Sequence, residues 1–321
     1  MGEISCPIPV IDLSEESMNE AAGNGGIPRC NQVREAMEEF GCFFVVYGSD
    51  SEMMKRGRVF HLLKELFDLP IETKMKNVNS NPEIPSINGY NRLSEIHENA
   101  NLFNATEPAT IQSFAHLMWP SGNPNFCETF ETYTKRLLEL HNLITRMLFE
   151  SYGIVDEEYY HSHINSMTYI MSLTGYKTSN KVDQEKEKFV GLRPHTDSDL
   201  ISILDQNGVQ GLEVKAKDGT WIPIHFPPSS FFVIASDALL VWSNGRISPC
   251  VHRVILEGKE DRYSIGMFSF LKGTVQIPHK LADHPHYPLK FKPFDHFAYI
   301  PFYKENKYLP AEERIKMFCG A

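Results

Sequence analysis

Apolar residues recur every three or four positions through much of the first half of the chain, which is the spacing of a helix that buries one face. Such runs cover 27–40, 51–67 and 125–153, and glycine or proline follows or closes each of them. In the third run the apolar positions alternate steps of four and three over its full length. We predict three helices, with a buried strand at 42–48, and expect the longest helix to pack against a sheet.

The stretch 72–122 interrupts this pattern. It is polar and rich in Asn, Ser and Pro, and it carries no sustained helical or strand periodicity. Long segments without regular structure are often functional in compact domains. We therefore expect an irregular surface loop or a lid here.

The pattern changes to short apolar runs separated by turn residues from about Met167 onward. Lys-Asp-Gly at 217–219, between two of these runs, is typical of a hairpin turn. Successive short strands without helices between them indicate an antiparallel sandwich or barrel. The run 238–243 is predicted as one of these strands, with Asp237 in a turn before it. A last helix is expected at 310–318.

Together these patterns predict a single domain over residues 1–321, of α+β class, in which helices surround a central β-barrel. Residues 1–160 form its mainly helical part, and 165–280 form its β-rich core. A C-terminal tail with one helix completes it at 281–321. No internal repeat or low-complexity tract divides the chain.

Composition narrows the class of protein. The 321 residues are 42% hydrophobic and 22% charged, with a formal net charge of −10. An acidic balance disfavours nucleic acid as a partner, because binding phosphates needs a basic surface. The apolar windows are too short to span a bilayer, and the first residues do not resemble a secretory signal. Six scattered cysteines suit a reducing compartment. We expect a cytoplasmic protein that is monomeric and binds no membrane.

The segment RPHTDSDLISIL, residues 193–204, contains the first candidate site. His195 and Asp197 stand two apart at the head of an expected strand, so both can point to the same side. His252, on a later expected strand, offers a third ligand. Two imidazoles and one carboxylate that leave coordination positions open suit Fe(II) in non-haem oxygenases.

Arg262 and Ser264 form the second candidate site, ten positions after the distal histidine. Their spacing also places them on one face of a strand. A guanidinium beside a hydroxyl binds a carboxylate well, through charge-assisted hydrogen bonds.

These spacings resemble those of the plant Fe(II)/2-oxoglutarate-dependent dioxygenases, and the resemblance covers nearly the whole chain. The stretches IPVIDLS, FGCFF, LFDLPIETK and WSNGR match the same family. FGCF, LMWP, VGLRPHTD and GLEVKAKDGTW are most similar to the branch that modifies glucosinolate side chains, whose relatives hydroxylate alkaloids and steroidal compounds.

The resemblance implies a double-stranded β-helix, the jelly-roll or cupin-like barrel, flanked by N-terminal and C-terminal helices. It implies Fe(II), 2-oxoglutarate and O2 as cofactor and cosubstrates, with ascorbate in support. The expected reaction oxidises a small, largely apolar plant specialised metabolite, by hydroxylation as the default, and releases succinate and CO2. The substrate would be a steroidal alkaloid, another alkaloid or a glucosinolate-type compound.

The resemblance also implies residue roles. His195, Asp197 and His252 would bind iron, and Arg262 with Ser264 would hold the distal carboxylate of 2-oxoglutarate.

Three further positions are implied by the same resemblance. Tyr176 would contact the cosubstrate, although Thr174 and Gly175 stand where the family carries Asn and Tyr. The usual Asn-His-Gly after the first strand is likewise replaced, by Tyr-Gly-Ser at 47–49. Phe268 matches an aromatic position that stacks on substrates in relatives.

Two alternatives stay open at this point. A zinc hydrolase could use the same three ligands with water as nucleophile. A small-molecule binder could keep the barrel without turnover. The other closely spaced histidines, at 161–163 and 284–286, have no third ligand in view and are predicted to be solvated surface residues.

Overall fold

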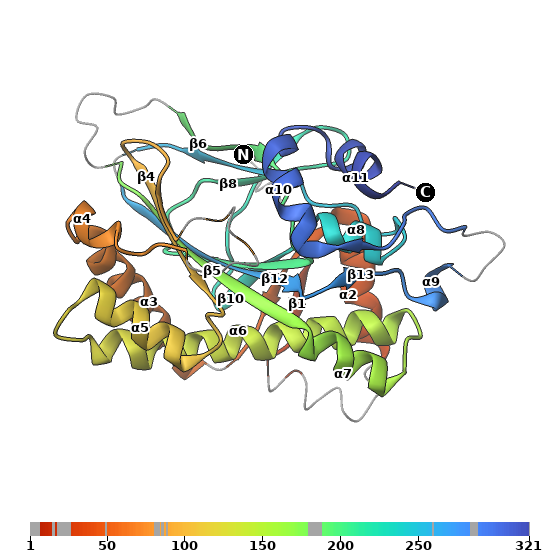
Figure 1. Cartoon of the computed structure of the whole chain (residues 1–321), viewed down its shortest axis with the longest axis horizontal. Coiled ribbons are helices and arrows are strands. Elements are labelled where there is room, and N and C mark those ends of the chain that lie inside the picture. Colours follow the sequence, from red (N-terminus) through yellow and green to blue (C-terminus); the bar gives the residue numbers. More distant parts are fainter. Residues whose placement is uncertain are drawn as a thin grey trace, which may run out of the picture.

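Two β-sheets with helices around them make up the molecule (Figure 1). The computed structural model describes residues 7–14, 17, 27–48, 50–79, 84, 87, 89–178, 188–258, 260–282 and 288–320. The helices are α2 (Ile27–Phe40), α3 (Asp50–Asp68), α4 (Ile71–Lys74), α5 (Pro108–Met118), α6 (Pro124–Ser151), α7 (Glu157–Asn165), α8 (Asp237–Trp242), α9 (His279–Ala282), α10 (His296–Asn306) and α11 (Ala311–Cys319).

The larger sheet has eight strands and the smaller has four. In spatial order, the larger contains β1 (Val10–Asp12), β2 (Cys42–Val46), β10 (Ser230–Ala235), β7 (Ile201–Gln206), β12 (Arg262–Leu271), β5 (Met167–Tyr176), β4 (His97–Phe103) and β3 (Tyr90–Arg92). The smaller contains β6 (Phe189–His195), β11 (His252–Leu256), β8 (Leu212–Lys215) and β9 (Trp221–Pro223). A separate pair joins β13 (Thr274–Val275) to β14 (Phe294–Asp295). The strands of the described chain therefore form distinct sheets rather than one closed barrel.

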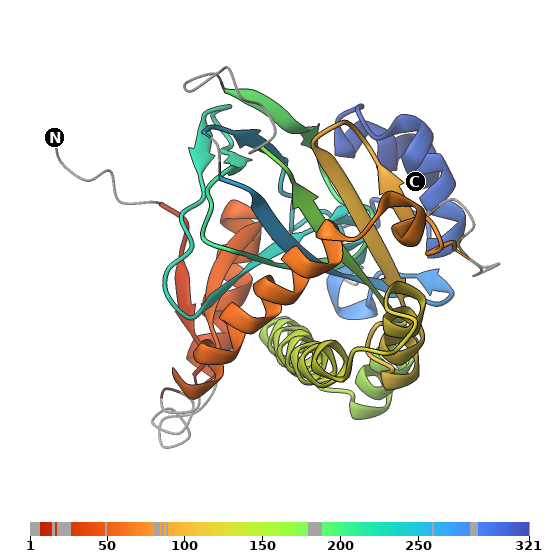
Figure 2. The same ribbon diagram turned by 90° about the vertical axis from the view of Figure 1, so that its left-hand side faces the viewer.

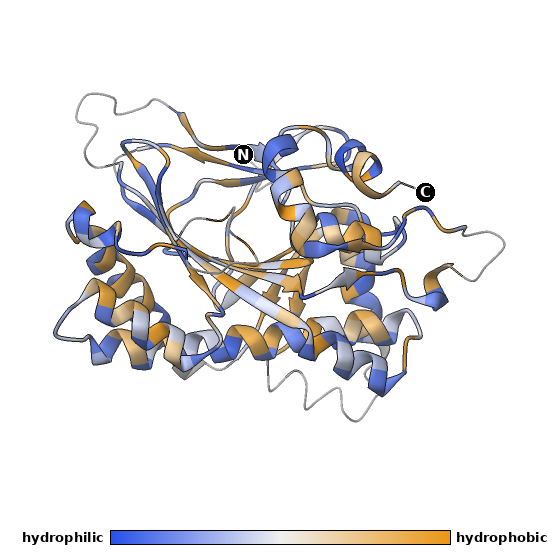
Figure 3. Cartoon of the chain, viewed as in Figure 1, coloured by the Kyte–Doolittle hydropathy of each residue, from blue (hydrophilic) through white to orange (hydrophobic). Residues whose placement is uncertain are grey.

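Helix α6 runs along one side of the larger sheet, as expected from its apolar stripe (Figure 1). Asn123 caps its start by accepting a hydrogen bond from the backbone N–H of Phe126, and Gly153 follows its end with φ +70°. Apolar side chains of α6, α3 and the sheet form one continuous core. Figure 2 shows the molecule turned by 90°, with α6 seen nearly end-on beneath the strands, and Figure 3 shows apolar residues concentrated in the strands of the larger sheet.

Two smaller apolar clusters join the sheets to each other. One contains Tyr176 of β5 together with Val254 and Leu256 of β11. The other brings Phe44 and Phe232 of the larger sheet against the smaller sheet. The two sheets therefore face each other across a shared interior.

The segment 72–122 is not an irregular loop, contrary to expectation. It contains β3, β4 and α5, and β4 pairs with β5 over its whole length. The sequence pattern did not predict this strand, because asparagine is depleted in strands in general. Here Asn99 pairs with Thr174 of β5 and faces the interior between the sheets.

Two further predictions, for the run 238–243 and for Asp237, are wrong. The run 238–243 lies in helix α8 and not in a strand, since a short apolar run does not distinguish the two states. Asp237 is the first residue of that helix and is fully buried beside Arg314. Helix α10 was not expected, because Pro301 lies inside it.

Among the helices in the described ranges, none combines the length and apolar character that a membrane crossing requires.

Candidate active site

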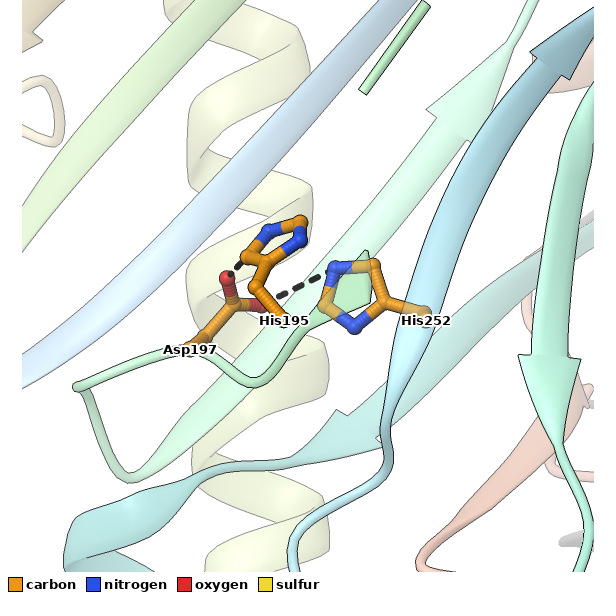
Figure 4. Close-up of side chains that lie close together, drawn as sticks. All are labelled: His195, Asp197 and His252. Carbon is orange, nitrogen blue, oxygen red and sulfur yellow. Dashed lines mark ion pairs between the residues drawn. The ribbon is translucent and has the colours of Figure 1, made fainter. Parts of the chain in front are cut away.

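His195 and His252 face each other across the antiparallel pair β6 and β11. Asp197 lies just beyond β6 in the loop that leads to β7, not on the strand as expected. The three side chains point toward one another (Figure 4), with one ligand atom of each within 4.8 Å of the others. Of the residues that the structure describes, these are the only three His, Cys, Asp or Glu side chains grouped closely enough to hold a metal ion.

Both imidazoles are oriented by the backbone. Nδ1 of His195 donates to the carbonyl of Arg193 at 2.9 Å, and Nδ1 of His252 donates to that of Cys250 at 3.1 Å. A carbonyl only accepts, so each Nδ1 carries the proton and each Nε2 presents its lone pair. These Nε2 atoms lie 3.6 and 3.7 Å from the Asp197 oxygens. The donor set therefore has the tautomers and the outer partners that metal-binding histidines need.

Protonation states also suit a metal ion. Burial raises the pKa of the Asp197 carboxyl, but the His252 and His195 rings outweigh it and bring the pKa to about 2. Burial lowers the pKa of His252 to about 4, so the ring is neutral near pH 7. A charged carboxylate and neutral imidazoles are the forms that ligate. Ser202 Oγ, 2.9 Å from Asp197 Oδ2, supports the carboxylate by donating to it.

A buried cation lies further along the same interior. Arg262 on β12 is 3% exposed and donates to Gln206 Oε1 at 2.9 Å and to Ser264 Oγ at 3.3 Å. Within the described residues no carboxylate pairs with it, and its Nε has no hydrogen-bond partner. A buried charge without a counter-ion is costly, so this arrangement favours an anionic ligand. Gln206 was missed by the sequence reasoning, although the alternation along β7 places it on this face.

Tyr176 is opposite Arg262 in the β5–β12 register, and its ring centre is 5.4 Å from the guanidinium carbon. His97 of β4 stacks on Tyr176 with ring centres 4.3 Å apart. His97 carried no sequence signal, because the strand that holds it was not expected. Gly175 is explained by packing: a Cβ there would come within 2.9 Å of the Phe67 ring.

The face of the larger sheet that carries Arg262 is accessible in part. Alternate residues of β5 and β12 on this face are partly exposed, namely Ser172, Thr174, Ser264 and Phe268. The residues between them pack into the helical core and are at most 1% exposed, as for Leu173, Ile265 and Met267. Phe268 therefore shares its face with Arg262 and packs beside Ile170 and Phe270.

The other histidine pairs behave differently from each other. His161 on α7 is exposed, as predicted, whereas His163 is half-buried with its ring centre 5.1 Å from that of Phe149. The histidines at 284 and 286 lie outside the described residues.

Comparison with known proteins gives matches over most of the chain. The family model of the 2OG-Fe(II) oxygenase superfamily matches residues 159–270, and that of the non-haem dioxygenase in morphine synthesis N-terminal matches 8–132. Among curated proteins, the probable 2-oxoglutarate-dependent dioxygenase AOP1.2 of Arabidopsis thaliana is 35% identical, covering 99% of this chain and 97% of the relative. The probable 2-oxoglutarate-dependent dioxygenase AOP1 of the same organism is 36% identical over 94% of this chain and 98% of its own length. Among solved structures, the dioxygenase for auxin oxidation of rice has a TM-score of 0.77 and 26% identity, with 98% of this chain and 100% of that chain covered.

Proposed function

The chain belongs to the 2OG-Fe(II) oxygenase superfamily, and we propose that His195, Asp197 and His252 hold its Fe(II). The protein is a 2-oxoglutarate-dependent dioxygenase that uses Fe(II), 2-oxoglutarate and O2. When bound, the iron supplies the activation of O2 that couples oxidation of a substrate to decarboxylation of 2-oxoglutarate, with succinate and CO2 as products. The observation that carries the ligand assignment is the pair of inward-facing Nε2 atoms beside a charged, buried carboxylate.

Arg262 and Ser264 bind the distal carboxylate of 2-oxoglutarate in this proposal. The buried guanidinium without a carboxylate partner among the described residues supports this role, since a bound dicarboxylate would supply the missing charge. Gln206 accepts a hydrogen bond from one end of the guanidinium, and the Tyr176 ring lies beside it.

We propose that the substrate binds on the same interior face. Phe268, Ile170 and Phe103 offer an apolar surface there, while Asn99 and Ser172 offer hydrogen-bonding groups, which bond to each other at 3.3 Å. We therefore propose that the substrate is a small molecule with a largely apolar body and one polar group. The enzyme would hydroxylate this molecule. Alkaloid and steroidal compounds fit this description, and a glucosinolate-type compound would present its apolar side chain to this surface.

The two facing sheets are, in this proposal, the halves of a double-stranded β-helix, and the chain is one catalytic unit. The apolar clusters that join the sheets support the first point. A single core that draws residues from β1 through α11 supports the second. A zinc hydrolase has no use for the buried Arg262, and a non-catalytic binder has no use for three preset metal ligands, so neither is favoured.

The test needs no substrate. Protein loaded with Fe(II) under anaerobic conditions is titrated with 2-oxoglutarate while the weak visible charge-transfer band of an iron-bound keto acid is followed. We expect the band in the wild type, its loss in His195→Ala, and a much higher half-saturating concentration in Arg262→Ala. His161→Ala and Arg146→Ala are matched controls, since both side chains lie on helices at the surface away from the site. No band at saturating iron and cosubstrate would overturn the proposal.

A further inference from the structure

The loop 196–200 joins the metal-binding end of β6 to β7, and we call it the metal loop. All five of its residues are buried. A buried carbonyl needs a hydrogen-bond donor, so each one in this loop must find a partner. The donors are Tyr303 Oη for Thr196 at 2.6 Å, the Asp237 N–H for Asp197 at 2.9 Å, His296 Nε2 for Ser198 at 2.9 Å, the Ala238 N–H for Asp199 at 3.1 Å and the Ser236 N–H for Leu200 at 3.1 Å.

Helix α10 supplies two of these five donors. Tyr303 donates to the carbonyl of Thr196, the residue before Asp197, and His296 donates to that of Ser198, the residue after it. His296 is fully buried, and its Nδ1 accepts from the Leu271 N–H, so its Nε2 carries the proton that it donates. The backbone on both sides of the ligand carboxylate is therefore held by one C-terminal helix.

Helix α11 contributes through Arg314, which is fully buried. Its guanidinium donates to the Thr196 hydroxyl at 2.6 Å and forms an ion pair with Asp237. The same Thr196 hydroxyl donates to Asp237 Oδ1 at 2.7 Å. Arg314 also donates to the carbonyls of residues 306, 307 and 309, where α10 ends. One side chain thus connects the end of α10, the start of α8 and the residue between the two metal ligands.

A buried ion pair contributes little net stability, because its desolvation cost offsets the attraction. What this network does provide is a fixed place for Thr196, and hence for the ligands on either side. We propose that helices α10 and α11 are part of the metal site, with Tyr303, His296 and Arg314 as positioning residues for Asp197. This rests on the proposed iron assignment. Because coupling between two events is reciprocal, metal binding in turn tightens the seating of α10 and α11.

The first test measures metal affinity. Co(II) serves as the probe, titrated anaerobically and followed by its visible absorption. Tyr303→Phe removes one hydroxyl and its bond to the metal loop, and Thr196→Val removes the hydroxyl that Arg314 and Asp237 share. We expect Co(II) affinity to fall about tenfold in each, as for other outer partners of metal ligands. Tyr160→Phe is the matched control, because Tyr160 also donates to a backbone carbonyl, that of Asn142 at 3.1 Å, far from the site.

The outcomes separate the two proposals. Wild-type affinity in both variants, with an unchanged Co(II) spectrum, overturns the positioning role and leaves the iron site intact. Failure of the wild type to bind Co(II) overturns the iron site and the positioning role together. If Thr196→Val does not fold, Tyr303→Phe decides alone, since it loses a single hydroxyl; circular dichroism and thermal unfolding confirm its fold.

The second test measures the reverse effect by amide hydrogen exchange. Saturating Co(II) is expected to slow exchange in α10 and α11, at least severalfold, as well as in the metal loop. Helix α7 serves as the internal control, because it lies on the other side of the molecule from α10 and α11 (Figure 1). Protection confined to the metal loop and to β6 and β11 would overturn the coupling between the C-terminal helices and the metal.

Discussion

His195 and His252 stand opposite each other on neighbouring antiparallel strands, with ring centres 4.3 Å apart and both Nε2 atoms turned toward Asp197. Asp197 and His252 are 55 positions apart in the sequence, and the pairing of β6 with β11 brings their side chains together. The backbone carbonyls behind each ring hold it in place before any metal arrives. The site is therefore preset, and its parts can be tested one at a time.

Asp197→Asn should abolish tight metal binding while the fold is kept. The substitution keeps the size of the side chain but removes the negative charge that a metal cation needs beside the two imidazoles. We expect Fe(II) affinity to fall more than about 100-fold, since loss of an outer partner alone costs about 10- to 100-fold. Anaerobic Fe(II) titration measures this. Asp218→Asn, in the exposed hairpin turn, should bind as the wild type does, and equal affinity in both variants would contradict the assignment.

Gln206→Leu should weaken 2-oxoglutarate without weakening iron. Its carbonyl oxygen accepts from Arg262 at 2.9 Å, and its loss leaves a buried guanidinium with one fewer partner. A hydrogen bond to a charged group contributes about 1.5 kcal/mol or more, so we expect roughly a tenfold higher half-saturating concentration of 2-oxoglutarate. The charge-transfer titration gives this value, and Fe(II) binding measured alone should stay unchanged. A parallel loss of Fe(II) affinity would show that Gln206 acts on the metal instead.

Stability should fall on acidification through His141, which is 1% exposed. Burial lowers its pKa to about 3, below the 6.5 of an exposed ring, so the folded state binds fewer protons than the unfolded one. Its contribution to the free energy of unfolding is therefore complete above pH 6.5 and is lost as pH falls from there toward 3. The loss between pH 7 and pH 5 is about 2 kcal/mol. Urea unfolding at the two pH values measures the loss.

The control for this pH effect is His141→Asn, which should be less stable at pH 7 but should lose less on acidification. Nδ1 of His141 is hydrogen-bonded to the Tyr169 hydroxyl at 3.1 Å, and an asparagine would retain a polar group at this position. An equal decrease in wild type and variant would assign the acid sensitivity to other groups.

A pair of glycines should respond to alanine in opposite directions. In Gly175→Ala the new methyl group meets the Phe67 ring at 2.9 Å, and we expect a loss of about 1–3 kcal/mol from overpacking. In Gly57→Ala, within helix α3, nothing lies within 4 Å, and we expect a gain of about 0.5–1 kcal/mol from helix propensity. Urea unfolding at neutral pH measures both. A stabilised Gly175→Ala would mean that Phe67 moves aside without cost.

The sequence by itself determined the reaction class and indicated the metal ligands that we propose. Period-two alternation, the spacing of His195 and Asp197 and the paired Arg262 and Ser264 were visible because local chemistry demands those residue types there. The long amphipathic helix α6 and the strands β5, β7 and β12 also followed from local pattern, since each buries one face.

Only the tertiary structure decided the rest. Strand β4 carries polar residues on the sheet face that also bears Tyr176 of β5, so its pattern resembles a loop until β5 is beside it. After Asp237, helix α8 is apolar all round because it is buried all round, and a short run of that kind carries no period. Arg314 stands 118 residues from Thr196, and nothing in either segment points to the other. Contacts between distant segments depend on how the whole chain packs, and they leave no local trace in the order of residues.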